Sequence, residues 1–227
     1  MIACPYNKRS TQAGFTLVEI AIVLVIIGLL LGGILKGQEM ITQAKIKNII
    51  NDFNGVTAAV NSYNDRYRAL PGDDSNVSTR WTGAFGGDGN GVFCTGACGF
   101  TPPGYNTAPA APSATSAEPS LFWNHLRLAG FVPGQTTGIA STAQPTNAAG
   151  GITGVQTTGM GFNSNIVCMS NLLDKIAVAV DTQMDDAGSA TGSVRGQLQI
   201  APNPATGTAA SNYAETGTNQ YLLCKNL

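Results

Sequence analysis

The sequence of 227 residues predicts an α+β fold, in which one long N-terminal helix packs on a small, loop-rich globular head. Three observations carry this prediction. An apolar run opens the chain, an amphipathic helical pattern follows it, and the remainder is rich in Gly, Pro, Thr, Ser and Asn with only short apolar segments. Those segments predict a short antiparallel sheet and one or two short helices. We therefore expect a leader, a span, an amphipathic helix and a head, at residues 1–14, 15–35, 36–70 and 71–227.

The apolar run at residues 15–35 has the length and composition of a membrane-spanning helix. At about 1.5 Å per residue, it crosses a hydrocarbon core of roughly 30 Å. Lys8 and Arg9 precede the run and place the N-terminus in the cytoplasm, with the rest of the chain beyond the membrane. Glu19 is its only ionisable residue, and a carboxylate there costs a few kcal/mol unless it is neutralised or paired. Glu19 therefore needs a partner.

The string GFTLVE, from Gly14 to Glu19, resembles the prepilin cleavage and methylation motif of type IV pilins and of the pseudopilins of type II secretion systems. The resemblance implies a pilin-like fold, cleavage between Gly14 and Phe15 by a prepilin peptidase, and methylation of the new Phe15 amino group. Segments of the head add a softer resemblance to pseudopilin-like proteins of Gram-negative bacteria: ALPGDD, GDGNG, FWNHLRLAGF and DTQMDDAGSATGSVRG. Signal-peptidase cleavage after the span stays open, because Gly32, Gly33 and Gly37 are small.

The resemblance also implies a function as a structural filament subunit that is anchored in the bacterial inner membrane, with a periplasmic head. Its implied partners are other pilin or pseudopilin subunits, the prepilin peptidase, an inner-membrane assembly platform and a cytoplasmic ATPase. In a helical stack, the Glu19 carboxylate can meet the Phe15 amino group of a neighbouring subunit, and the pair then favours one register. The alternative is a carboxylate at the lipid interface without a partner. Gly28 matches a glycine of such pilins, whereas Lys36 stands where many have proline.

Beyond the span, apolar residues recur every seven positions in two interleaved series and predict an amphipathic helix that ends before Pro71. We expect this stripe to pack on the chain's own head rather than on another chain. Its members are Ile46, Ile49, Phe53, Val56, Val60, Tyr63, Tyr67 and Leu70.

Within the head, local patterns predict two further helices, at residues 118–130 and 170–184, the second capped by Ser170. Residues 194–200 and 221–224 are candidate strands, and residues 133–161 favour short strands with long turns. Trp81 and Phe85 are expected to anchor the core.

Five cysteines occur, and Cys4 lies in the expected leader. The remaining four form an even set in a domain beyond the membrane, which favours two disulfides. Three pairings are possible. We favour Cys94 with Cys98 and Cys168 with Cys224, because the second pair closes a long loop and fixes the C-terminus. A metal site is the alternative, although neither CxxC spacing nor a nearby histidine supports it.

Two acidic turns are candidate calcium sites, at Asp88 with Asn90 and at Asp185 with Asp186. Each is also typical of an ordinary solvated turn, so we expect no cofactor. His125 is expected to be structural, because no nucleophile motif accompanies it.

Composition and motifs limit the remaining function classes. Twelve basic and 13 acidic residues form no basic stripe, so no nucleic-acid partner is predicted. No zinc motif or nucleophile elbow is present, so an anchored hydrolase ranks last and no enzyme activity is expected. The alternative to a filament subunit is a membrane-tethered or filament-tip module for binding or adhesion.

Overall fold

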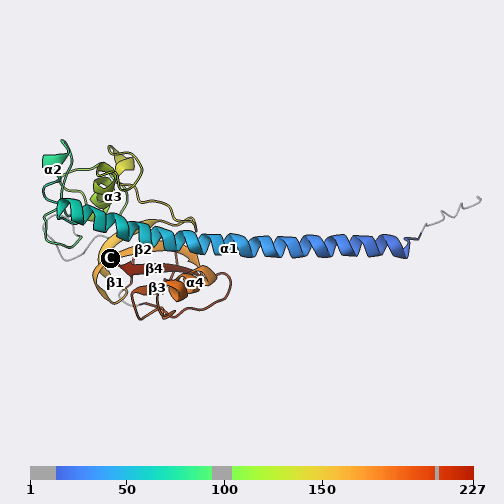
Figure 1. Ribbon diagram of the computed structural model, residues 1–227. Coiled ribbons are helices and arrows are strands. Elements are labelled where there is room, and N and C mark those ends of the chain that lie inside the picture. Colours follow the sequence, from blue (N-terminus) through green and yellow to red (C-terminus); the bar gives the residue numbers. More distant parts are fainter. Residues whose placement is uncertain (1–13, 94–103, 208–209) are drawn as a thin grey trace, which may run out of the picture. The chain divides into compact units, whose positions relative to one another are not determined.

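The computed structural model describes residues 14–93, 104–207 and 210–227 (Figure 1). The chain divides into two compact units, Met1–Gln43 and Ala44–Leu227, which are described separately. In chain order, the elements are α1 (Leu17–Tyr67), α2 (Val77–Arg80), α3 (Glu118–Leu128), the 3₁₀ helix η1 (Ile139–Ser141), β1 (Thr153–Gly159), β2 (Phe162–Leu173), α4 (Asp174–Met184), β3 (Val194–Leu198) and β4 (Gln220–Asn226). The α+β class predicted from the sequence is thus confirmed.

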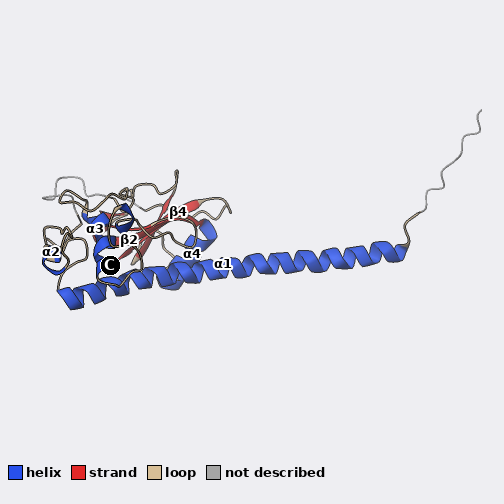
Figure 2. Cartoon of the chain, turned by 90° about the horizontal axis from the view of Figure 1, so that it is seen from above, coloured by secondary structure: helices blue, strands red, loops and turns tan. Residues whose placement is uncertain are grey.

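The first unit consists of the first half of α1 and the residues before it. All described side chains from residue 14 to residue 36 are exposed. Lys36 forms an ion pair with Glu39 at 2.8 Å, where the polarity of the helix rises. The glycines at positions 28, 32, 33 and 37 do not interrupt the helix, which is continuous in Figure 2.

The second unit is built on a four-stranded antiparallel sheet with the strand order β1-β2-β4-β3 (Figure 1). β2 is the longest strand and pairs with both β1 and β4. Cys168 of β2 lies directly opposite Cys224 of β4. The C-terminal strand is therefore central in the sheet, because β3 pairs along its other side.

One face of the sheet carries the main hydrophobic core, and the helices cover this face. Val167 and Met169 of β2 contribute to it from the sheet, as the period of two in a strand requires. The second half of α1 contributes Ile46, Ile49, Phe53, Val56, Ala59, Val60 and Tyr63, and α3 and α4 supply the rest of the helical side. The predicted stripe thus packs on the chain's own head, with Tyr67 and Leu70 partly buried at its end.

The opposite face of the sheet carries a smaller cluster, in which strand residues pack with loop residues. Tyr105 and Met160 cover Ile166 and Leu222, and the Cys168–Cys224 disulfide lies within the same cluster. Both faces of the sheet are therefore shielded from water, one by helices and the other by loop residues.

Two predictions for the head are wrong. Ser170 does not cap a helix: residues 162–173 form β2, and α4 begins at Asp174. The pairing of β2 with two neighbouring strands outweighs the local helical pattern, and the buried Ser170 hydroxyl accepts a hydrogen bond from the Ile152 N–H at 2.9 Å. Phe85 is 36% exposed and anchors no core, whereas Phe93 is fully buried.

Candidate processing and assembly site at the N-terminus

The residues at the start of α1 form a capping box. The Thr16 hydroxyl oxygen accepts a hydrogen bond from the Glu19 N–H at 3.2 Å. In return, Glu19 Oε2 accepts hydrogen bonds from the Thr16 N–H at 2.9 Å and from the Thr16 hydroxyl at 3.0 Å. Two N–H groups at the helix start are satisfied reciprocally, as in the S/T-x-x-E signature. Thr16 was not among the residues predicted from the sequence, although its spacing from Glu19 is the signal for this box.

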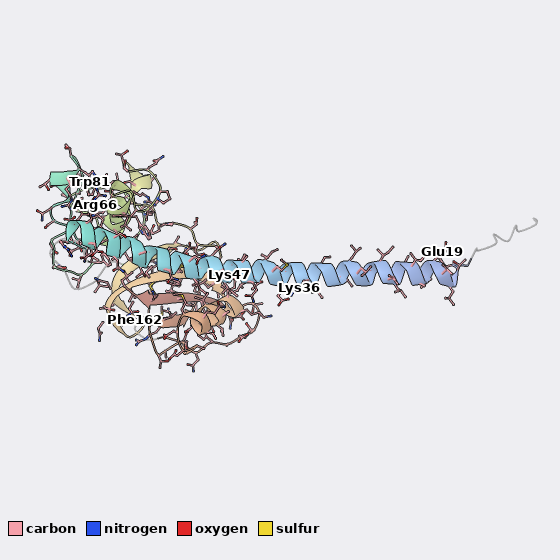
Figure 3. The ribbon with its side chains drawn as sticks, in the orientation of Figure 1. Glu19, Lys36, Lys47, Arg66, Trp81 and Phe162 are labelled. Carbon is pink, nitrogen blue, oxygen red and sulfur yellow. A yellow bond between two sulfur atoms is a disulfide. The ribbon has the colours of Figure 1, made fainter. Side chains whose placement is uncertain are left out.

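The capping box fixes the position of the Glu19 carboxylate one turn from Phe15. Its Oε2 accepts hydrogen bonds from the N–H and the hydroxyl of Thr16. The negative charge near a helix N-terminus is also favoured by the helix dipole. Glu19 lies in the first turn of α1, where Figure 3 labels it.

The apolar surface around Glu19 is not covered by the described part of the chain. Phe15 is 83% exposed and Leu17 is 86% exposed, and the large side chains as far as Leu35 are similarly open. Within the described part of the chain, α1 is the helix long and apolar enough to cross a membrane. Since an apolar surface of this extent is unfavourable in water, lipid or another subunit has to cover it.

The glycines of this segment pack against no other residue that the structure describes. A Cβ atom added at Gly28, Gly32, Gly33 or Gly37 would meet nothing within 4 Å. A glycine costs a helix about 1 kcal/mol relative to alanine. The benefit that offsets this cost must come from outside the described chain, and close packing of neighbouring helices is one such benefit.

His125, a candidate from the sequence, is a buried structural residue of α3. Its Nδ1 accepts a hydrogen bond from the Gly72 N–H at 2.8 Å, and its Nε2 lies 2.8 Å from the Phe85 carbonyl oxygen. These partners fix a neutral ring that donates from Nε2. Burial lowers the His125 pKa to about 4, even though the bond to Phe85 acts in the opposite direction.

Both acidic turns gather carboxylates that were not predicted from the sequence, two at the first turn and one at the second. Asp88 lies with Asp73 and Glu118, and Asp185 and Asp186 lie with Asp181. Asp73 and Glu118 are distant in sequence, so no local signal joins them to Asp88. By contrast, Asp181 precedes Asp185 by four residues, the helical spacing that could have indicated it.

The long-range disulfide favoured from the sequence is present in the structure. Cys168 and Cys224 are bonded across adjacent strands, with 56 residues of sequence separation. Cys94 and Cys98 lie outside the described residues, so their predicted pairing stays a prediction.

Comparison with known proteins gives a match at the N-terminus. Residues 9–35 match the family model described as the prokaryotic N-terminal methylation motif. No curated protein and no solved structure shows a significant match to the chain. The motif is consistent with the type IV pilin and pseudopilin family, and it supports a pilin-like or pseudopilin precursor. Such proteins are structural, and the motif with the apolar helix fits a membrane-anchored, single-pass protein that assembles with other subunits.

Proposed function

We propose that this chain is a structural subunit of a type IV pilus or of a type II secretion pseudopilus. Prepilin peptidase cuts the precursor after Gly14, and the new amino group of Phe15 is methylated. The four regions 1–14, 15–35, 36–70 and 71–227 then act as cytoplasmic leader, filament-core helix, amphipathic helix and head. The match of residues 9–35 to the methylation motif carries this proposal.

The capping box supports a role for Glu19 in assembly. When neighbouring helices cover the exposed residues around it, its carboxylate leaves water, and a buried charge without a partner is strongly unfavourable. The positively charged amino group that cleavage creates at Phe15 of a neighbouring subunit can neutralise this carboxylate. Thr16 holds the carboxylate in place before the pair forms, so less side-chain freedom is lost on assembly.

Two features of the head support the proposal: one favours export across the membrane, and the other favours a minor subunit or a pseudopilin. Its Cys168–Cys224 disulfide fits an oxidising compartment such as the periplasm, which agrees with the orientation expected from Lys8 and Arg9. The head is larger than that of a compact major pilin, which favours a minor subunit or a pseudopilin. Glu19 argues against the minor pseudopilin class that usually lacks this residue.

The substitution Glu19→Gln tests the assembly charge separately from the helix cap. Glutamine satisfies the capping box as glutamate does, but it cannot neutralise an amino group. We expect a tenfold or greater loss of filaments, measured by shearing and immunoblotting, while the amount of processed subunit in the membrane stays unchanged.

Thr16→Ala is the matched control, because it removes the cap and leaves the charge. It should cost about 1 kcal/mol at the helix start and reduce filaments only slightly. Filaments at the wild-type level from Glu19→Gln would contradict the assembly role, and an equal loss in both variants would assign the effect to the cap.

The N-terminus of the assembled subunit tests the processing step. Mass spectrometry of sheared filaments should show a chain that begins with methylated Phe15, and a substitution of Gly14 should leave the precursor uncut. A chain that begins near Gly33 or Gly37, at the end of the apolar run, would instead indicate signal-peptidase cleavage and would exclude a filament-core helix. A chain that is absent from filaments would refute the structural role.

A further inference from the structure

A polar cavity of about 440 Å³ opens in the head where α1 ends. It is lined by the last turn of α1, by the segment that leads to α2, and by Gly89 and Gly91, while Asn165 of β2 contributes from the sheet. Figure 1 shows α2 beside the end of α1. All of these residues belong to the second unit. Small-ligand sites usually enclose about 300–1,000 Å³, so the cavity has the size of a binding site.

Two carboxylates in the wall of the cavity are already satisfied by the head itself. Asp73 accepts hydrogen bonds from the backbone N–H groups of residues 89–91 at 2.6–3.2 Å. Asp74 accepts a hydrogen bond from the Tyr63 hydroxyl at 2.7 Å and forms an ion pair with Arg80. These bonds hold the loops that shape the cavity, and they leave neither carboxylate in need of a cation.

Four exposed side chains of the same cavity have unused hydrogen-bonding groups: Asn64, Arg68, Ser75 and Asn76. Within the described part of the chain, the two amides and the serine hydroxyl form no hydrogen bond. Asn76 is the N-cap residue of α2, where an asparagine ordinarily bonds to a helix N–H, yet its side chain makes no such bond. These groups are therefore available to a ligand.

Arg68 has a backbone conformation that is costly for arginine. Its φ of 55° lies in the left-handed region. It follows the last residue of α1, and its N–H donates to the Asn64 carbonyl oxygen at 2.7 Å. Helices commonly place glycine at such a position. The Arg68 side chain meets Asp65 at 4.0 Å with both groups more than four-fifths exposed, a contact worth little, so the benefit of an arginine here lies in the cavity.

Tyr67 gives the cavity an aromatic surface. The residue is half-buried, and its ring packs against the rings of Tyr63 and Trp81, with centroids 4.7 and 5.4 Å away. These neighbours hold the ring in place. A fixed ring with polar side chains around it suits a ligand that has one apolar face and a polar rim.

We infer that this cavity binds a neutral sugar residue of a glycan. A sugar hydroxyl both donates and accepts hydrogen bonds, and the amides of Asn64 and Asn76 offer both kinds of group. The guanidinium of Arg68 adds donors in a fixed, planar arrangement. The C–H face of a sugar ring packs on the aromatic surface of Tyr67.

Charge distinguishes a neutral ligand from an ion. Asp74 is paired with Arg80, and the other two charged residues of the cavity, Asp73 and Arg68, are opposite in sign. The cavity thus favours neither an anion nor a cation.

Backbone pairing distinguishes a sugar from an extended peptide. A peptide that adds to a sheet needs a free strand edge, whereas β2, which reaches the cavity at Asn165, is paired with β1 and β4. The inference goes beyond the filament role and does not rest on it, because the cavity is complete within a single head.

Binding of the purified full-length chain to immobilised sugars tests the inference. The panel contains neutral hexoses and N-acetylhexosamines, with sialylated and sulfated glycans for comparison, and the detergent has no sugar headgroup. We expect at least one neutral sugar to capture the chain about tenfold more strongly than the acidic glycans do, and the same sugar in free form to reverse the capture. Capture by no neutral sugar, or equal capture by acidic glycans, would overturn the inference.

Variants locate the site and separate binding from folding. Arg68→Gly should retain or raise Tm, because glycine adopts a positive φ freely, and should weaken sugar capture about tenfold. Asn76→Ala should weaken capture without a change in Tm, since the side chain caps no helix. Asn61→Ala is the matched control, exposed on α1 outside the cavity, and should retain wild-type capture. Unchanged capture in both Arg68→Gly and Asn76→Ala, or an equal loss in Asn61→Ala, would refute the assignment.

Discussion

The two halves of α1 place their apolar residues in different surroundings. In the second half, one side of the helix is buried against the sheet, α3 and α4, and the other side is polar. In the first half, apolar side chains surround the helix and all are exposed. One continuous helix thus serves two kinds of partner. The head covers the second half, and the partner of the first half is lipid or another subunit.

Alanine substitutions in the two halves should have different consequences, and the loss of head stability on substitution in the second half is the largest effect we expect. Phe53 is fully buried, so Phe53→Ala should destabilise the head by about 3–5 kcal/mol in chemical unfolding followed by tyrosine and tryptophan fluorescence. Leu30 is 60% exposed, so Leu30→Ala should leave the stability of the head unchanged and reduce filament yield instead. A loss of head stability in Leu30→Ala would show that the first half also packs on the head.

The Cys168–Cys224 disulfide should contribute to the stability of the head alone. Replacing both Cys168 and Cys224 by serine opens a loop of 56 residues in the unfolded chain and should cost about 4 kcal/mol. Urea unfolding of the full chain, with and without reductant, measures this cost. The pair Cys94→Ser and Cys98→Ser is the control, because the predicted Cys94–Cys98 bond would close a loop of only a few residues. An equal loss in the control would contradict the assignment of stability to the Cys168–Cys224 bond.

His125 should make the stability of the head depend on pH. Its folded pKa of about 4 lies below its ordinary value of 6.5, so the unfolded state binds the proton first. Its contribution is complete above pH 6.5 and is lost as the pH falls towards 4, by about 3 kcal/mol in all.

The difference in unfolding free energy between the wild type and His125→Gln, measured from pH 7 to pH 4, isolates this contribution from that of the carboxylates. Glutamine can donate and accept as the neutral ring does, but it does not titrate in this range. Parallel pH profiles for the two proteins would contradict the buried neutral ring and would leave the head with an ordinary acid sensitivity.

Local periodicity accounts for what the sequence could predict, and non-local pairing accounts for what it could not. The buried stripe around Phe53 follows from a spacing that is fixed by the helix itself. Ser170 was misassigned because its segment fits a helix locally, while β1 and β4, which hold it as a strand, lie elsewhere in the sequence. The Thr16–Glu19 box was readable from the sequence, whereas the meeting of Asp73 with Glu118 depends on the tertiary fold.

Glycine-to-alanine substitutions should give the smallest effects and the sharpest distinction between the halves. Neither Gly32 nor Gly55 has an atom within 4 Å of an added Cβ, so alanine should favour the helix by up to about 1 kcal/mol at either position. Gly55→Ala should therefore stabilise the head slightly and leave filaments unchanged. Gly32→Ala should reduce filament yield, because an extra methyl separates helices that pack at this glycine. Normal filaments from Gly32→Ala would contradict close packing there.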